Sequence, residues 1–447
     1  MNAIYTDDRL LESCTEESRH TAPEQGCRAF STRSFAGARR EPSNMLRDIY
    51  GRIESTVLSS RCDESLLRPR MPELDSIRGL AILMVLVFHG FLRYEQADAI
   101  PRAMAVFIDV TKFGRLGVNL FFVLSGFLIT GLLVDSVGRA DYFRRFYVRR
   151  VSRILPAFYA TLVLLVITRH VPRAFLGFSA VFLANLSPLF GVTTAYAVLW
   201  SLAVEEHFYL VWPMIVRHMT TRNLLRLCVA IVLFEPMLRA ISYVFASRHG
   251  TEWNDVTRYT WNAADGMVLG CILALSVREF HWTRKRALRI AAVVMAGAAV
   301  VFCAGLPFGI ATRHGTLLGA AMQEVPWNFI FGGMVTLFLV LGTGQWKRLV
   351  VLPVLMFLGR ISYGLYLIHF LIFDEYDAVA MRYLPRLVAV HGDVGLIWIR
   401  FVIASTCAIL IAWLSRETIE EFFLNLAKRD SPARPLVPSS RHVHQGV

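Results

Sequence analysis

Residues 74–89 read LDSIRGLAILMVLVFH, an apolar run long enough to enter a lipid bilayer, with an arginine near its start and a histidine inside it. An α-helix rises about 1.5 Å per residue, so Arg78 and His89 lie about 16 Å apart along the axis. If Arg78 lies at one membrane surface, His89 lies well within a hydrocarbon core of about 30 Å. Ionisable groups at that depth by default face a cavity and mark function. The alternative is a histidine that only links helices through a hydrogen bond.

Composition places the chain among polytopic membrane proteins. Its 447 residues are 55% hydrophobic and only 18% charged, which is more apolar surface than a soluble core of this size would hide. The net charge of +13 could indicate nucleic-acid binding, but the basic residues fall in short clusters between apolar runs, as in cytoplasmic loops. The seven cysteines show no metal-type spacing. We therefore expect membrane lipids as surroundings, no nucleic-acid partner and no metal site.

The apolar runs predict an all-α integral membrane protein, a polytopic bundle of about ten transmembrane helices plus a possible re-entrant segment. The ten runs are 74–92, 114–134, 154–169, 197–216, 223–245, 263–277, 287–306, 326–343, 351–373 and 395–415. With the N-terminus inside, this count leaves every strong basic cluster on the cytoplasmic side. An eleventh crossing at 174–190 would break that pattern, so we expect a re-entrant or interfacial segment there.

The polar ends of the chain are predicted to lie outside this bundle. Residues 1–70 are rich in Arg, Ser and Glu, and we expect a largely disordered cytoplasmic extension. Residues 71–416 form the predicted transmembrane domain, and residues 417–447 form a basic cytoplasmic tail.

The second span and the loop after it carry two candidate features. Ser125 and Gly126 lie in FFVLSGFLI, where the small pair allows close approach of another helix; a nucleophilic serine is the alternative. The loop beginning at Tyr142 holds the densest basic cluster of the chain. Its Arg150 and Arg153 lie three residues apart, on what helical periodicity makes one face, and paired guanidinium groups suit phosphate binding.

The segment 200–209, WSLAVEEHFY, places two carboxylates and a histidine inside a predicted span. Neighbours on a helix point about 100° apart, so Glu205 and Glu206 cannot both serve one partner. Depths estimated from the two membrane surfaces make contact between Glu205 and His89 possible, directly or through one water. A purely structural salt bridge is the alternative. In the ninth span, SYGLYLIH places Tyr363 and His369 on a polar seam that we interpret mainly as structural.

Five motifs together carry a resemblance to a known family. They are Arg78 followed by His89, FFVLSGFLI at 121–129, RRVSRILP at 149–156, WSLAVEEHFY at 200–209 and SYGLYLIH at 362–369. In this order and spacing they resemble the acyltransferase-3 family of bacterial membrane O-acyltransferases. The resemblance covers about 74–415. It implies a multi-pass protein of the bacterial inner membrane, in a form without a C-terminal SGNH esterase-like domain, and with both termini in the cytoplasm.

The resemblance also implies an activity and its substrates. The enzyme would move an acyl group, often acetyl, from cytoplasmic acyl-CoA to a hydroxyl of an extracytoplasmic or lipid-linked carbohydrate such as exopolysaccharide or O-antigen, with no permanently bound cofactor. A neutral imidazole is the usual base for deprotonating an alcohol, so His89 is the predicted base and Glu205 its orienting carboxylate. The predicted substrate- and donor-binding residues are Arg78, Ser125, Arg150, Arg153, Trp200, Tyr209, Tyr363 and His369. A proton-coupled transporter or flippase of a lipid-linked sugar is the alternative, because buried ionisable residues fit that function equally well.

Overall fold

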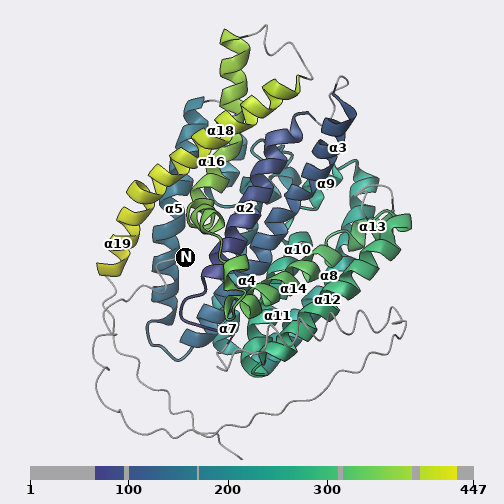
Figure 1. The fold of residues 1–447 in the computed structure, drawn as a ribbon, viewed down its shortest axis with the longest axis vertical. Helices are drawn as coiled ribbons and strands as arrows, with labels where there is room; N and C mark the ends of the chain where they lie inside the picture. The colour runs from purple at the N-terminus through teal and green to yellow at the C-terminus, as the bar shows by residue number, and fades with distance from the viewer. Residues whose placement is uncertain (1–65, 95–99, 169–170, 311–315, 385–392, 430–447) are drawn as a thin grey trace, which may run out of the picture.

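The computed structural model describes residues 66–94, 100–168, 171–310, 316–384 and 393–429, which form helices and contain no β-strand (Figure 1). The predicted all-α class is confirmed for these residues. The long helices are α2 (Pro72–Leu92), α4 (Gly117–Ser136), α5 (Tyr142–Thr168), α7 (Leu199–His218), α8 (Thr221–His249), α11 (Asp265–Glu279), α12 (Arg284–Gly305), α14 (Val325–Gly342), α16 (Pro353–Tyr383) and α18 (Val394–Ser415). The short α-helices are α3 (Arg102–Thr111), α6 (Arg173–Ala180), α9 (Trp253–Val256), α10 (Thr260–Ala263), α13 (Leu317–Met322), α15 (Lys347–Val350) and α19 (Glu421–Arg429).

Seven of these helical segments are long and apolar enough to cross a membrane, and the prediction of ten is not confirmed. The three predicted spans outside the seven are helices α7, α8 and α11. Helix α11 has only 15 residues, and α7 and α8 carry ionisable residues in their middle. Helix α8 nevertheless leaves apolar side chains exposed, including Leu233 at 72%, as expected for contact with lipid.

Close helix contacts form the centre of the bundle. Helix α2 packs along α16, where a Cβ on Gly79 would collide with the backbone carbonyl of Leu355. Helix α4 packs along α11 in the same way, because a Cβ on Gly126 would collide with the carbonyl of Met267. Small residues are what allow helix backbones to approach this closely in membranes. The predicted role of Ser125-Gly126 in close approach is therefore confirmed.

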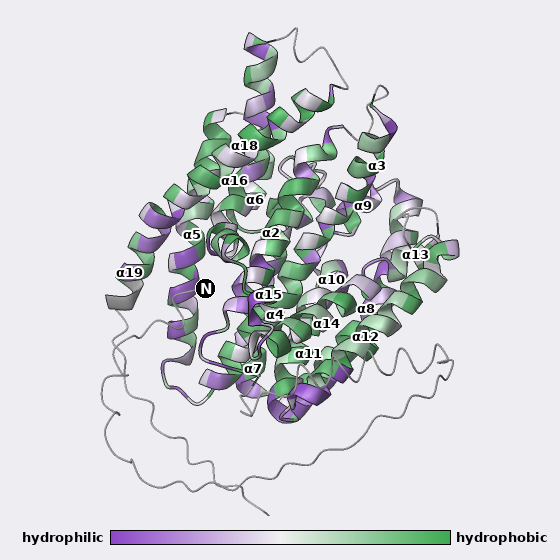
Figure 2. Cartoon of the chain, in the orientation of Figure 1, coloured by the Kyte–Doolittle hydropathy of each residue, from purple (hydrophilic) through white to green (hydrophobic). Residues whose placement is uncertain are grey.

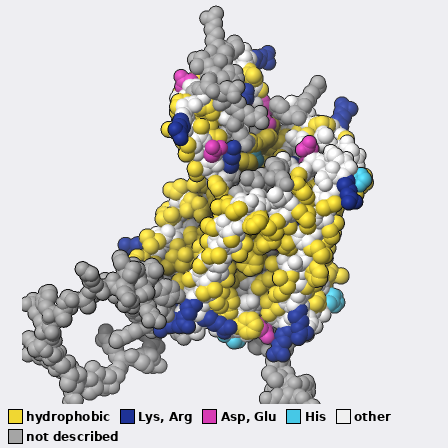
Figure 3. All heavy atoms as spheres, turned by 90° about the vertical axis from the view of Figure 1, so that its right-hand side faces the viewer, with side chains coloured by type: hydrophobic (Ala, Val, Ile, Leu, Met, Phe, Trp, Pro, Cys, Tyr) yellow, Lys and Arg dark blue, Asp and Glu magenta, His cyan; other side chains and the backbone are white. Residues whose placement is uncertain are grey.

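The basic connections between helices meet at one end of the bundle. The Arg217 guanidinium lies 5.5 Å from the Tyr142 ring centroid, which joins the α7–α8 and α4–α5 connections. Arg222 lies 3.6 Å from Glu279, and Arg284 donates a 2.6 Å hydrogen bond to the carbonyl of Thr343. Hydrophilic residues mark this lower end in Figure 2, and Figure 3 shows Lys and Arg there below a broad apolar band. We call it the basic end.

Two segments differ in detail from the sequence-based expectation. The cluster from Tyr142 to Arg153 is not a loop, because it forms the first turns of α5, which continues as one helix to Thr168. Segment 174–190 forms α6 and the 3-10 helix η3 (Ala184–Phe190), separated near Phe182, whose φ is positive at 58°. Neither piece is long enough to cross a bilayer. Residues 1–65 and 430–447 lie outside the described residues, and most of the predicted extension and most of the predicted tail lie with them.

Candidate functional site

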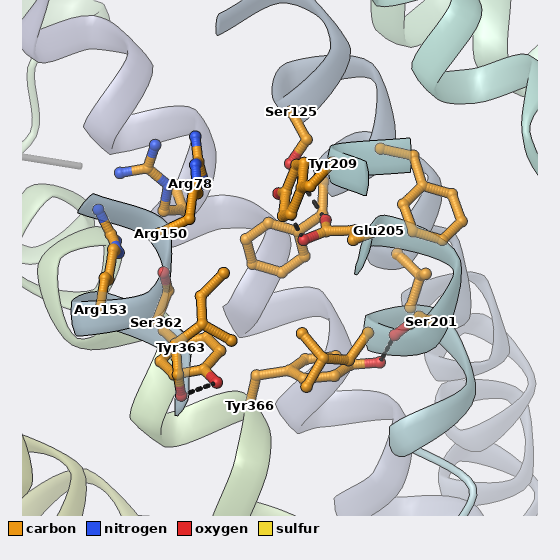
Figure 4. A pocket seen from close by; sticks show the side chains of 15 residues that line it. Arg78, Ser125, Arg150, Arg153, Ser201, Glu205, Tyr209, Ser362, Tyr363 and Tyr366 are labelled. Atoms are coloured by element: carbon orange, nitrogen blue, oxygen red, sulfur yellow. Dashed lines mark hydrogen bonds between the residues drawn. The ribbon is translucent and has the colours of Figure 1, made fainter. Parts of the chain in front are cut away.

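A pocket near the basic end brings together three predicted arginines. We call it the arginine pocket; it has a volume of about 90 Å³ and draws its walls from α2, α4, α5, α7 and α16. Arg78 comes from α2, and Arg150 and Arg153 come from the same face of α5, as the periodicity predicts. Figure 4 shows these arginines on one side and Glu205 on the other. The lining residues carry three positive charges and one negative charge.

Glu205 is held by two hydroxyl groups. Ser125 donates a hydrogen bond of 3.1 Å to Oε1, and Tyr209 donates one of 2.9 Å to Oε2. The ring of Tyr209 in turn lies 4.6 Å below the Arg150 guanidinium, a cation–π contact. Ser125, Tyr209 and Glu205 therefore form one connected wall that orients Arg150. Since Ser125 donates to a carboxylate that could also accept a proton, the geometry leaves the alternative of a nucleophilic serine open.

A second pocket lies farther along α2. We call it the His89 pocket; it has a volume of about 140 Å³, and its walls include His89 and Trp200. Three side chains line both pockets: Val118, Phe122 and Tyr366. Residues common to both linings lie between the two cavities, so these three form a thin shared wall. Arg78 and His89, about 16 Å apart along α2, thus belong to separate pockets placed back to back.

His89 is paired with a second histidine. Its Nδ1 lies 3.1 Å from Nε2 of His369, a residue of α16 with no solvent exposure. Nδ1 of His369 lies 3.0 Å from the carbonyl of Leu365, and a carbonyl can only accept, so this nitrogen carries the hydrogen. In a neutral ring Nε2 of His369 then accepts, and Nδ1 of His89 must donate. This arrangement leaves the lone pair of His89 on Nε2, the nitrogen needed for a general base.

The structure corrects one predicted contact. We expected Glu205 to contact His89 directly or through one water, but Glu205 lines the arginine pocket and His89 lines the other. The hydrogen-bond partners of His89 are His369 and the carbonyl of Val85. The estimated depths matched because both residues lie near the middle of the bundle, whereas depth alone does not determine which direction a side chain points. Glu205 does face a cavity, while Oε1 of Glu206 is buried with no hydrogen-bond partner among the described residues.

The other predicted binding residues lie at or beside the two pockets. Tyr363 lines the arginine pocket and donates a 2.8 Å hydrogen bond to the carbonyl of Ile154. Trp200 lines the His89 pocket, with its ring 5.9 Å from Phe122 in an edge-to-face contact. Tyr366, the second tyrosine of the SYGLYLIH motif, has its hydroxyl 2.5 Å from that of Ser201. Their binding roles remain predictions.

A buried charge cluster in the wall of the His89 pocket was missed. Arg239 of α8 is 1% exposed and lies 2.5 Å from Asp265 and 3.2 Å from Glu235. It also donates a 2.9 Å hydrogen bond to the carbonyl of Asn262. The sequence contained a usable signal, because Glu235 and Arg239 form an i, i+4 pair of opposite charge inside a predicted span.

The role of His369 can be tested by substitution. We expect His369→Leu to lower kcat by about 10- to 100-fold with donor KM unchanged, since His89 loses the acceptor that orients its ring and selects its tautomer. His369→Gln, whose amide oxygen can accept in place of Nε2, should recover most of that loss. Steady-state rates of acyl transfer by the two purified variants provide the comparison. Equal losses in both would show that His369 acts only by filling space.

Comparison with known proteins extends these observations. Residues 71–417 match the acyltransferase-3 family, described as an acyltransferase domain. The chain is 32% identical over 249 residues to YrhL of Bacillus subtilis strain 168, covering 48% of this chain and 34% of that protein. It is 30% identical over 244 residues to the peptidoglycan O-acetyltransferase OatA of Listeria monocytogenes, covering 49% and 35%.

A third relative, the O-acetyltransferase OatA of Staphylococcus aureus, is 24% identical over 343 residues, covering 69% of this chain and 51% of that protein. The chain thus spans between about a third and half of the length of these relatives. No solved structure matches it. The family match includes both pockets and all five motifs, and it shows that the chain belongs to the acyltransferase-3 family.

Proposed function

We propose that the chain is a membrane-bound O-acyltransferase that moves an acetyl group from acetyl-CoA to a carbohydrate hydroxyl. The observation that carries the proposal is the pair of back-to-back pockets, one with three arginines and one with His89, separated by Val118, Phe122 and Tyr366. Two substrates approaching from opposite ends would meet at this wall. The relatives named as O-acetyltransferases support acetyl as the group transferred.

The arginine pocket is suited to the donor. Guanidinium groups bind phosphate oxygens in a bidentate manner, and the phosphates of acyl-CoA are its most strongly charged groups. Arg150 is oriented by stacking on Tyr209, and Nη1 of Arg153 is buried with no hydrogen-bond partner among the described residues. Such an orphaned buried donor carries a desolvation cost that a bound phosphate would remove. The thin pantetheine arm would then extend toward the shared wall.

The chemistry requires a base on the far side of that wall. The acceptor hydroxyl loses its proton to Nε2 of His89 while its oxygen attacks the thioester carbonyl. A carbon–oxygen bond forms, the carbon–sulfur bond breaks, and the thiolate of CoA takes up the proton that His89 received. The donating Nδ1 of His89 keeps its hydrogen bond to His369 during this step.

The orientation follows from charge. The basic end would face the cytoplasm of a bacterial inner membrane, with ten helices crossing and both termini inside. Cytoplasmic acyl-CoA would then reach the arginine pocket directly, and an extracytoplasmic carbohydrate would reach the His89 pocket. Peptidoglycan, named for the Listeria relative, is one such acceptor, and exopolysaccharide, O-antigen or a lipid-linked sugar are others of the same chemistry.

One experiment separates this function from transport. Proteoliposomes containing the purified protein receive acetyl-CoA labelled in the acetyl group on one side and a lipid-linked or soluble sugar on the other. Covalent label on the sugar is the expected result. Movement of the sugar across the bilayer without label would instead establish a transporter or flippase.

The donor site predicts a change in KM. Replacing both Arg150 and Arg153 with lysine preserves the positive charge and the membrane topology but removes the bidentate forks. We expect the KM for acetyl-CoA to rise about tenfold, equivalent to about 1.4 kcal/mol of binding. Initial rates over a range of donor concentrations measure it, with Arg144→Lys, outside both pockets, as the matched control. An unchanged KM would restrict these arginines to setting topology.

A further inference from the structure

The His89 pocket has a different chemical character from the arginine pocket. Its volume of about 140 Å³ is roughly ten times the 10–15 Å³ that one water needs. Ligand sites of this kind combine an apolar wall with a few convergent polar groups. Beside His89, the walls carry the indole of Trp200 and three side-chain amides, from Asn119, Asn254 and Asn262.

The arginines that line the His89 pocket are each paired with a carboxylate. Arg239 lies 2.5 Å from Asp265, Arg115 lies 3.7 Å from Glu324, and Arg258 lies 3.3 Å from Asp255. Glu235 adds a further carboxylate behind Arg239. Asp265 and Glu324 also line the cavity, so an anionic ligand would meet two carboxylates as well as three guanidinium groups that already have carboxylate partners. In the arginine pocket, three cations face one lining carboxylate, and of the three only Arg78 has a carboxylate within salt-bridge distance among the described residues, Asp75 at 3.0 Å.

The polar groups of the pocket are of the kind that recognises hydroxyls. A hydroxyl both donates and accepts, so it is best matched by amides and by neighbouring donor and acceptor groups. Asn119 is oriented by hydrogen bonds of 3.1 Å to Glu324 and 3.0 Å to Asn328, and Asn262 by one of 2.9 Å to the carbonyl of Val256. The half-buried indole of Trp200 offers an apolar face with a polar edge, which suits the C–H face of a sugar ring.

Resting on the function proposed above, we infer that the His89 pocket is the acceptor site and that it selects an uncharged sugar ring over an acidic one. Trp200 contacts the face of the ring, the amides of Asn119 and Asn254 bind its hydroxyls, and the reacting hydroxyl lies at Nε2 of His89. The carboxylate partners of the arginines set the selectivity, because each one cancels a charge that would otherwise attract a carboxylated sugar.

Removing one carboxylate partner tests the selectivity directly. The probes are a neutral methyl glycoside and the matching methyl uronide, each offered with labelled acetyl-CoA to the purified full chain. Wild type should favour the neutral probe in kcat/KM by about tenfold or more. Asp255→Asn removes one carboxylate partner of Arg258, and Glu324→Gln removes one of Arg115; each should lower that preference at least fivefold. Asp135→Asn is the matched control, since it removes the partner of Arg278, 2.7 Å away, at the basic end.

The possible outcomes separate failure of the acceptor-site inference from failure of the proposed function. A preference for the uronide in wild type, or an unchanged preference in both the Asp255 and Glu324 variants, overturns the inference while leaving the transferase intact. In native membranes, label on endogenous carbohydrate but on neither added probe, with neither probe competing, also overturns it. Failure of the protein to label any carbohydrate would instead refute the proposed function itself. Trp200→Ala should raise the KM for the neutral probe without altering the KM for the donor.

Discussion

Replacement of His89 with alanine is expected to lower kcat for acyl transfer by about 10² to 10⁴, the usual contribution of a positioned general base. The reason is geometric: Nδ1 of His89 donates to His369, so Nε2 keeps its lone pair at the wall of a pocket. The substitution removes a half-buried side chain at a cavity edge, so insertion and folding should be preserved. Transfer of labelled acetyl, measured on protein quantified in the membrane, gives the result.

His207→Ala is the matched control for this experiment. His207 lies in α7, close to Glu205 in sequence, and is hydrogen-bonded at 2.7 Å to Thr260, but it lines neither pocket. We expect its loss to change kcat by less than a few fold. Activity of His89→Ala above a tenth of wild type would rule out His89 as the base.

Replacement of Arg239 with leucine is expected to cause the largest loss of stability. Arg239 is the cation that neutralises Glu235 and Asp265, and all three are buried. Removing one partner from a buried ionic cluster leaves uncompensated charge and costs about 3–5 kcal/mol. The contact between α8 and α11 depends on this cluster, so the variant should show a lower melting temperature in detergent and less folded protein in the membrane.

Neutral substitutions at the two carboxylates provide the control. Adding Glu235→Gln and Asp265→Asn to Arg239→Leu removes the charges that would be stranded, so part of the lost stability should return. Glu235→Gln alone should be mild, because Arg239 keeps its contact with Asp265. A melting temperature of Arg239→Leu equal to that of wild type would mean that the cluster does not hold α8 in place.

Sequence reasoning predicted the positions of the helices more accurately than the side-chain contacts between them. Apolar runs identify helical segments well because hydrophobicity is a property of one segment, and the five motifs placed His89, Glu205 and the arginines at cavities. The predicted partner of His89 was wrong because the rotation of each helix about its own axis, which decides where its side chains point, depends on tertiary packing. His369 occupies the position predicted for Glu205, since α16 packs along α2 through Gly79. The division into two pockets could not be predicted, because it depends on how side chains from two helices distant in sequence, α4 and α16, meet.

The thin wall between the pockets also bears on permeability. Under the proposed orientation, the arginine pocket lies toward the cytoplasm and the His89 pocket toward the opposite side, and Val118, Phe122 and Tyr366 line both. The layer at which a thioester would meet a hydroxyl must therefore also block ions. Each elementary charge that crosses a potential of 100 mV gains about 2.3 kcal/mol, which is the driving force for leakage. Under this orientation, substitution of these three side chains by smaller ones should increase ion leakage across the membrane.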